Sequence, residues 1–315
     1  SALRYSAQEL TWWTVQPQVE RALPALRETC RTLAAQRPAG GTLRLDPTTP
    51  IPKEVTALDI HLMPGCFHTE FTADDVAQGA VYTLGTAVFG GALKLRTRGG
   101  GVASSVARWL RTTRPGFAPA RILDLGCTTG ANTLPYLDVF PDAELHGVDV
   151  GAPLLRYAHA RAEMLGRQVH YSQQNAESLD FADGSFDLVV SSFFLHEQSV
   201  RSTAQILREA HRVLRPGGLM VHMELPPASE TDPYYSFYLD WDAYYNNEPH
   251  YAAFRALDLR QVVYDAGFDA ADYFQTQIPN WGTVSEQEFA DCALGRRPPP
   301  AHGNGASWFI FGADR

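Results

Sequence analysis

The sequence predicts an α/β protein with a doubly wound, seven-stranded, mostly parallel sheet and an N-terminal helical cap. Its 315 residues allow about two domains, or one large domain with a subdomain. Hydrophobic residues make up 45% of the chain and charged residues 19%, which is enough apolar material for a sizeable core. From Ala120 on, short apolar runs alternate with helical stretches. This alternation is typical of a parallel sheet with helices on both faces.

The N-terminal piece, residues 1–116, is expected to be a helical cap or lid. Apolar residues recur at near-helical spacing over Ala7–Ala35, and a Pro-rich loop follows over Asp46–Pro52. Val76–Leu93 is an uncharged run of 18 residues and is long enough to test as a membrane span. Its four glycines and several polar residues make it too polar for a lone span. We therefore expect a buried helix with a Gly-rich end, and no membrane partner.

Residues 117–315 are expected to form the sheet domain, with a lid inserted at 226–251. Five segments are predicted strands: RILDLG, ELHGVDV, QVHYSQQN, FDLVVSSFFL and GLMVHMEL. The Arg-Pro-Gly-Gly that follows Leu214 ends a helix just before the fifth strand. The other expected elements are helices over Ala152–Leu165, Ser202–Leu214 and Phe254–Ala266 and strands over Asp269–Gln277 and Ser307–Gly312.

Composition disfavours several classes of function. Lys plus Arg is 26 against 35 for Asp plus Glu, a net charge of -9, whereas proteins that bind nucleic acid normally carry a basic face. The four cysteines lie far apart without metal-binding spacing, which indicates free thiols in a reducing compartment: Cys30, Cys66, Cys127 and Cys292. The N-terminus has no signal-peptide pattern. We expect a cytoplasmic enzyme with a small-molecule substrate.

The sharpest motif is ILDLGCTTG, residues 122–130, a strand that ends in a glycine turn and opens a helix. The dinucleotide fingerprint would need glycine at Thr128, so NAD is disfavoured. Asp149 closes the second strand, where a carboxylate can accept hydrogen bonds from ribose hydroxyls. Asn175 follows the third strand, and its carbonyl can accept from an exocyclic amine such as that of adenine. Together these residues predict a nucleoside-containing ligand.

In these motifs the chain, from about Phe117 to Arg315, resembles the class I S-adenosylmethionine-dependent methyltransferases. The resemblance rests on ILDLGCTTG, GVDV, QQNAESLDFADGSFDLVVSSFFLHE and LREAHRVLRPGGLMVHMEL. It implies a seven-stranded sheet and S-adenosylmethionine as cofactor. Thr128 stands where the family often has glycine, and Asn175 where it often has aspartate.

The resemblance also implies a cofactor site. Asp124, Gly126 and Gly130 would line the methionine part, Asp149 the ribose, and Asn175 with Ala176 the adenine. The full expected cofactor-binding set is Asp124, Gly126, Cys127, Thr128, Gly130, Asp149, Val150, Asn175, Ala176 and Ser191.

Candidate catalytic side chains follow neighbouring strands. His196 and Glu197 end strand four, and His222 and Glu224 lie on one face of strand five. They could supply a general base, although a satisfied polar pair is an equally good interpretation of His196 and Glu197. We expect no metal, because the spacing is weak evidence for one.

Two further segments carry candidate residues. Six of the 13 tyrosines fall within Asp232–Tyr251, which either packs the cap against the sheet or forms a lid over the substrate. The expected lid and substrate residues are Tyr234, Tyr235, Tyr238, Trp241, Tyr245 and Glu224. The loop Asp59–Glu70 contains His61 and His68, either of which is a candidate base or a loop-fixing hydrogen-bond partner. The expected catalytic set is His61, His68, His196, Glu197 and Tyr244.

Three functions remain open at the level of sequence. The first is methyl transfer to a small-molecule acceptor, a secondary or specialised metabolite, in a cleft closed by the cap and the Tyr-rich insertion. The second uses the cofactor as substrate, cyclising it to azetidine-2-carboxylate with release of methylthioadenosine. The third is a non-catalytic nucleoside-binding or regulatory protein. We favour the first.

Overall fold

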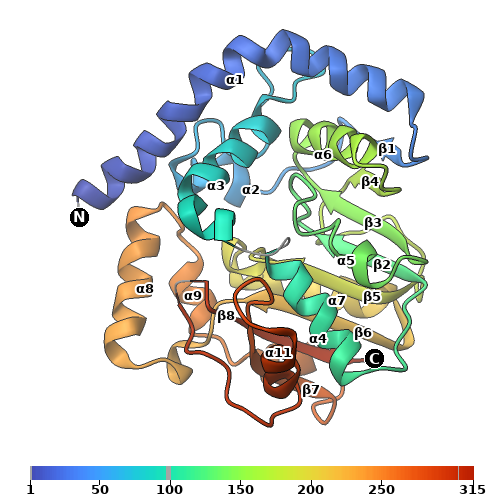
Figure 1. Ribbon diagram of the computed structural model, residues 1–315, viewed down its shortest axis with the longest axis vertical. Helices are drawn as coiled ribbons and strands as arrows, with labels where there is room; N and C mark the ends of the chain where they lie inside the picture. Colours follow the sequence, from blue (N-terminus) through green and yellow to red (C-terminus); the bar gives the residue numbers. More distant parts are fainter. Residues whose placement is uncertain (1, 97–100, 304) are drawn as a thin grey trace.

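The computed structural model describes residues 2–96, 101–303 and 305–315. Its centre is one eight-stranded sheet with the strand order β1-β4-β3-β2-β5-β6-β8-β7 (Figure 1). Among the described strands, only β8 runs opposite to the rest, and it pairs antiparallel with β6 and β7. The strands are β1 Thr42–Arg44, β2 Arg121–Leu125, β3 Glu144–Asp149, β4 His170–Gln173, β5 Phe186–Ser192, β6 Leu214–Glu224, β7 Tyr273–Pro279 and β8 Ser307–Asp314. The predicted doubly wound, mostly parallel sheet is confirmed.

The seven predicted strands are all present, and β1 is an additional edge strand. Thr42–Arg44 pairs in parallel with His170–Ser172 of β4. Its three residues carry too little periodicity to indicate a strand, so its pairing depends on β4 already being in place.

Helices cover both faces of the sheet, because the strands are apolar on both sides. One face packs against α4 (Val102–Thr113), α5 (Tyr136–Val139), α6 (Ala152–Met164) and α11 (Glu286–Ala293). The other packs against α7 (Val200–Val213), α9 (Tyr251–Arg255) and α10 (Leu259–Asp265). The last two replace the single helix predicted over Phe254–Ala266. The break follows from Asp258, whose side chain accepts from the backbone N–H of Gln261 and starts a new helix.

Helices α1 (Ala2–Gln36) and α3 (Ala77–Arg96) form a layer outside α6 (Figure 1). Trp12, Val15 and Val19 of α1 are buried against α3 and the loop between the two helices. Gly85 permits this contact, because a Cβ there would collide with the indole of Trp12. Short helices α2 (Lys53–Thr56) and η1 (Ile60–Leu62) lie in that loop. We use the name cap for helices α1 to α3 and the segments that connect them, apart from β1, which belongs to the sheet.

The predicted boundary at residue 116 places α4 in the cap, but α4 packs on the sheet. Val106 and Leu110 are buried in the core cluster that includes Ile122 and Val190 of the central strands. The predicted buried helix over Val76–Leu93 corresponds to α3. None of the helices in the described ranges combines the length and apolarity that a membrane span requires.

The tyrosine-rich segment is helix α8, Pro233–Tyr245. Asp232 begins it by accepting a hydrogen bond from the N–H of Tyr235, and Pro233 suits the first helical position. Its buried residues Leu239 and Ala243 pack with Leu225, which follows β6. The helix thus lies beyond the carboxyl end of β6, apart from the main helical layers (Figure 1).

Candidate functional site

A cavity lies at the carboxyl ends of the central parallel strands β2 to β5, where ligands bind in folds of this kind. Cap residues Phe67 and Tyr82 complete its lining. Of the residues predicted from sequence, Asp124, Gly126, Cys127, Thr128, Asp149, Val150, Asn175, Ala176 and Glu197 line it. Phe67, Tyr82 and Gln198 also line it, although no sequence motif predicts them.

The turn after β2 brings main chain to the cavity. Gly126 has φ 66°, and a Cβ there would collide with the ring of Phe194. Gly130 has φ 71°, and a Cβ there would collide with the hydroxyl of Tyr171. Thr128 also lies in the left-handed region, with φ 45°, a conformation that strains a β-branched residue. Thr128 therefore adopts a backbone conformation typical of glycine, at the position where the family often has glycine.

Asp149 is fixed by two backbone donors. Its Oδ2 accepts from the N–H of Thr128 at 2.9 Å and its Oδ1 from the N–H of Gly151 at 2.9 Å. Burial raises the pKa of Asp149 to about 6, and these N–H groups counteract part of that effect. The carboxylate thus ties the turn after β2 to the end of β3.

Two other cavity residues have defined partners. Burial raises the pKa of Asp124 to about 7, although the hydroxyl of Thr133 donates to its Oδ2 at 2.6 Å. Asn175 accepts from the N–H of Glu177 at 2.9 Å through Oδ1, which shapes the turn after β4.

Two predicted cofactor residues do not line the cavity. Gly130 packs against the hydroxyl of Tyr171 instead. The hydroxyl of Ser191 lies 2.7 Å from Nδ1 of buried His222, and burial lowers the pKa of that histidine to about 3. The serine that lines the cavity is its neighbour Ser192. Successive residues of a strand point to opposite faces, so a shift of one position moves the hydroxyl out of the site.

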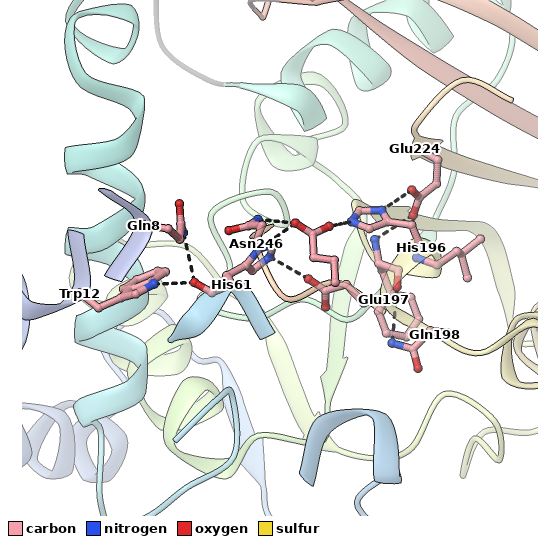
Figure 2. A network of polar contacts seen from close by, with 11 residues as sticks. Gln8, Trp12, His61, His196, Glu197, Gln198, Glu224 and Asn246 are labelled. Carbon is pink, nitrogen blue, oxygen red and sulfur yellow. Dashed lines mark hydrogen bonds and ion pairs between the residues drawn. The ribbon is translucent and has the colours of Figure 1, made fainter. Parts of the chain in front are cut away.

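The two histidines His61 and His196 are joined in a largely buried polar network (Figure 2). His61 Nε2 lies 3.1 Å from Glu197 Oε1, and His61 Nδ1 lies 3.2 Å from Glu248 Oε1. His196 Nε2 lies 3.6 Å from Glu248 Oε2. The amide of Asn246 contacts both His61, at 2.8 Å, and Glu248. Glu248 and Asn246 were missed, because nothing in their local pattern distinguishes them from a polar loop.

The backbone of His61 is held in an uncommon conformation. His61 has φ 58° and Leu62 φ 56°. The indole N–H of Trp12 donates to the carbonyl of His61 at 2.7 Å, and Gln8 donates to it at 3.2 Å. Helix α1 thus fixes the direction in which the imidazole points (Figure 2).

Both histidines of the network favour the charged form. Burial alone would lower the pKa of His61, but the carboxylates of Glu248 and Glu197 outweigh it and raise the pKa to about 10. Burial is likewise outweighed at His196, where Glu224 and Glu248 raise the pKa to about 9. Burial would raise the pKa of Glu248, but His61 lowers it overall.

Glu224, expected from sequence to face the substrate, is a buried structural residue. Its Oε1 accepts from the N–H groups of Phe194 and Leu195, at 2.9 and 2.6 Å. Its Oε2 lies 2.6 Å from Nδ1 of His196. A fully buried carboxylate needs such partners, and here it shapes the turn after β5.

The remaining catalytic candidates lie outside this network. His68 is half-buried, its Nδ1 has no hydrogen-bond partner among the described residues, and burial lowers its pKa. Tyr244 is 76% exposed on α8.

The lid candidates form an aromatic row along α8. Ring centroids are 6.1 Å apart for Tyr235 and Tyr238, 6.2 Å for Tyr238 and Trp241, and 5.4 Å for Trp241 and Tyr245. Tyr234 is 80% exposed. None of the six predicted lid residues lines the cavity. Tyr235 approaches it indirectly, because it packs in one cluster with cavity residue Phe193.

The described residues contain no group of three or more His, Cys, Asp or Glu side chains placed to hold a metal ion. The four cysteines are free and buried.

Comparison with known proteins identifies relatives of the sheet domain. A family model described as a methyltransferase domain matches residues 122–218. A demethylmenaquinone methyltransferase of Thermus thermophilus is 39% identical over 110 residues, which cover 35% of this chain and 49% of that protein. A ubiquinone/menaquinone biosynthesis C-methyltransferase, UbiE, of Klebsiella pneumoniae is 30% identical over 172 residues, covering 49% of this chain and 68% of that protein.

The structure of an O-methyltransferase family protein from Burkholderia thailandensis is 16% identical, with a TM-score of 0.49 over 76% of this chain and 60% of that one. The chain spans about half to two thirds of the length of the curated relatives it matches. The match to two thirds of a relative at 30% identity, together with the matched domain, shows that the chain belongs to the class I S-adenosylmethionine-dependent methyltransferases, in agreement with the cofactor predicted from sequence.

Proposed function

We propose that this chain transfers the methyl group of S-adenosylmethionine to a small-molecule acceptor, a secondary or specialised metabolite. The observation that carries the proposal is the cavity itself. Its floor is the turn after β2 and the ends of β3 and β4, and Phe67 and Tyr82 of the cap close over it. A site of this shape suits a small ligand better than a polymer.

The residues present fit the cofactor. The turn from Gly126 to Thr128 offers main chain without bulky side chains, Asp149 offers a carboxylate to ribose hydroxyls, and Asn175 with Ala176 flanks an adenine position. When bound, the cofactor supplies an electrophilic methyl group on a sulfonium.

The protein's own contribution would be alignment of the acceptor, exclusion of water and, where the nucleophile carries a proton, a base. His61 and His196 are poorly suited to accept a proton near neutral pH, because their raised pKa values keep them protonated. Of the five candidates, Glu197 alone lines the cavity. We therefore place Glu197 nearest to the reacting groups, and His61 and His196 behind it.

The relatives' names supply one acceptor class to test, demethylmenaquinone and related compounds of ubiquinone and menaquinone biosynthesis. The alternative of cofactor cyclisation is not favoured, because the named relatives are methyltransferases. A non-catalytic binding protein would bind the cofactor without turnover.

One experiment separates the three. The purified protein is incubated with S-adenosylmethionine alone, with a small-molecule extract, and with a naphthoquinol. The products are measured by mass spectrometry. S-adenosylhomocysteine formed only with acceptor supports the proposal. Methylthioadenosine formed without acceptor supports cyclisation, and binding without either product supports a sensor.

A further inference from the structure

The charge of the cavity lining restricts what it can bind. Its ionisable carboxylates are Asp124, Asp149 and Glu197, and its described lining residues include no lysine, arginine or histidine. An anionic group placed beside Glu197 would meet a like charge, and no cationic side chain among the described lining residues would compensate it. A neutral or positively charged group would meet no such penalty.

Glu197 has one carboxylate oxygen that no contact within the described residues engages. Asp149 uses both oxygens to accept backbone N–H groups, whereas Asp124 accepts from Thr133 through Oδ2 alone and is only 2% exposed. Glu197 Oε1 is paired with His61. Within the described residues, no hydrogen bond or ion pair engages Glu197 Oε2, although the side chain is only 13% exposed. A carboxylate oxygen on a cavity wall that no protein donor engages can accept a hydrogen bond from a ligand.

The position of Glu197 is set from several parts of the chain. Its backbone N–H donates to the carbonyl of Phe194, within the turn that Glu224 fixes. Its side chain is held by His61, which Glu248 and Asn246 hold in turn (Figure 2). These contacts leave the carboxylate few alternative orientations, as a preorganised binding group requires.

The walls next to Glu197 are aromatic. Phe67, Phe193 and Phe194 line the same cavity, and Phe67 packs edge-to-face on Tyr82 with ring centroids 5.8 Å apart. Such rings accommodate a flat apolar body and attract a cation over their faces.

From these observations we infer that Glu197 anchors the methyl acceptor, and that the acceptor presents an uncharged or cationic amine or hydroxyl, with no negative charge beside the reacting atom. His61, Glu248 and Asn246 are positioning residues that act through Glu197. This inference rests on the proposed function and names its substrate class.

The test uses matched probes that share one ring. Benzylamine, benzyl alcohol and benzoate are titrated into the full chain saturated with S-adenosylhomocysteine, and binding is followed by ligand-observed NMR. In the wild type, benzylamine or benzyl alcohol should bind about 10-fold or more tightly than benzoate, as expected for a hydrogen bond to a charged group. The relative affinity of amine and alcohol identifies the preferred donor.

Glu197→Gln should remove the preference over benzoate. It should leave the affinity for S-adenosylhomocysteine within about twofold, because the residues expected to bind the cofactor, among them Asp149 and Asn175, are unchanged. Glu286→Gln, an exposed glutamate on α11, is the matched control and should change neither affinity. If Glu197→Gln does not fold, as judged by its circular dichroism, Glu197→Asp replaces it and should weaken the preference.

Three results would overturn the inference. They are equal binding of benzoate, no detectable binding of any probe, and a large loss of S-adenosylhomocysteine affinity in Glu197→Gln, which would assign Glu197 to the cofactor instead. Failure of the wild type to bind S-adenosylhomocysteine is a separate result, and it counts against the proposed function itself.

Discussion

The imidazole of His61 joins the carboxylate of Glu248 across 3.2 Å between Nδ1 and Oε1. His61 belongs to the cap, whereas Glu248 follows α8 near the other end of the chain. The same ring contacts Glu197 at the cavity, so one side chain connects the cap, the cavity and the segment after α8.

This relationship predicts a pH-dependent stability. The pKa of His61 is raised from 6.5 to about 10, so its stabilising contribution is fully present below about 6.5 and is lost as the pH rises through about 10. In His61→Gln this loss is absent. The free energy of unfolding of the wild type, measured with urea, should therefore fall more steeply across this window than that of the variant. Parallel curves would show that the ion pairs of His61 contribute nothing to folding.

The sheet and the turn after β2 could be predicted from sequence because their signals are local. ILDLG combines a buried strand with a glycine turn, and the positions of Asp149 and Asn175 follow from the ends of the next two strands. Each signal lies within a few residues of the structure that it specifies.

The polar network could be predicted only in part because it depends on pairing between distant segments. His61 and Glu197 were each identified as candidates, but Glu248 was not, and the partners of each became visible only in the fold. Strand periodicity predicts only the face of the sheet on which Glu224 lies. The contact of its carboxylate with the backbone of the turn after β5 depends on the fold. Ser191, predicted to bind the cofactor, does not line the cavity, and a single register step separates it from Ser192, which does.

Replacing Asp149 should weaken cofactor binding. Asp149→Asn removes a charged acceptor at the expected ribose position, and we expect the Kd for S-adenosylhomocysteine to rise about 10- to 100-fold, as for the loss of a hydrogen bond to a charged group. Isothermal titration calorimetry measures this change.

Ser191→Ala is the informative comparison, because its hydroxyl pairs with His222 and does not line the cavity. It should leave cofactor affinity unchanged while lowering the free energy of unfolding by about 1 kcal/mol, since the buried imidazole loses a partner. A loss of affinity equal to that of Asp149→Asn would mean that Ser191 does reach the cofactor.

The contact between α1 and α3 depends on a glycine. In Gly85→Ala the new methyl group would overlap the indole of Trp12, so the two helices must separate or Trp12 must change rotamer. We expect a loss of roughly 1–3 kcal/mol in the free energy of unfolding, as for overpacking of a core. Gly116→Ala is the control, because no atom lies within 4 Å of the new Cβ. Equal stability of the two variants would mean that the cap packs differently in solution.

Helix α8 is held by Arg255, which is one of the largest fully buried side chains among the described residues. Its guanidinium pairs with Asp240 at 2.5 Å and donates to Thr231 and Ser236 at 2.9 Å each. Arg255→Met leaves these acceptors without their donor. Because Asp240 is 43% exposed and can be hydrated, we expect a loss of roughly 1–3 kcal/mol, the scale for leaving hydrogen-bonding groups without a partner. Because the lost contacts belong to α8, chymotrypsin should also cleave at the aromatic residues of this helix faster than in the wild type.

The matched control for Arg255 is Arg297→Met, which removes a surface ion pair with Glu288 at 3.1 Å. Arg297 is 59% exposed, so its loss should change the free energy of unfolding by less than about 1 kcal/mol and leave the cleavage rate unchanged. If Arg255→Met lowered stability without faster cleavage in α8, the arginine would stabilise the sheet domain as a whole. If cleavage alone increased, Arg255 would anchor only the helix, and cofactor binding by the cavity should then remain intact in that variant.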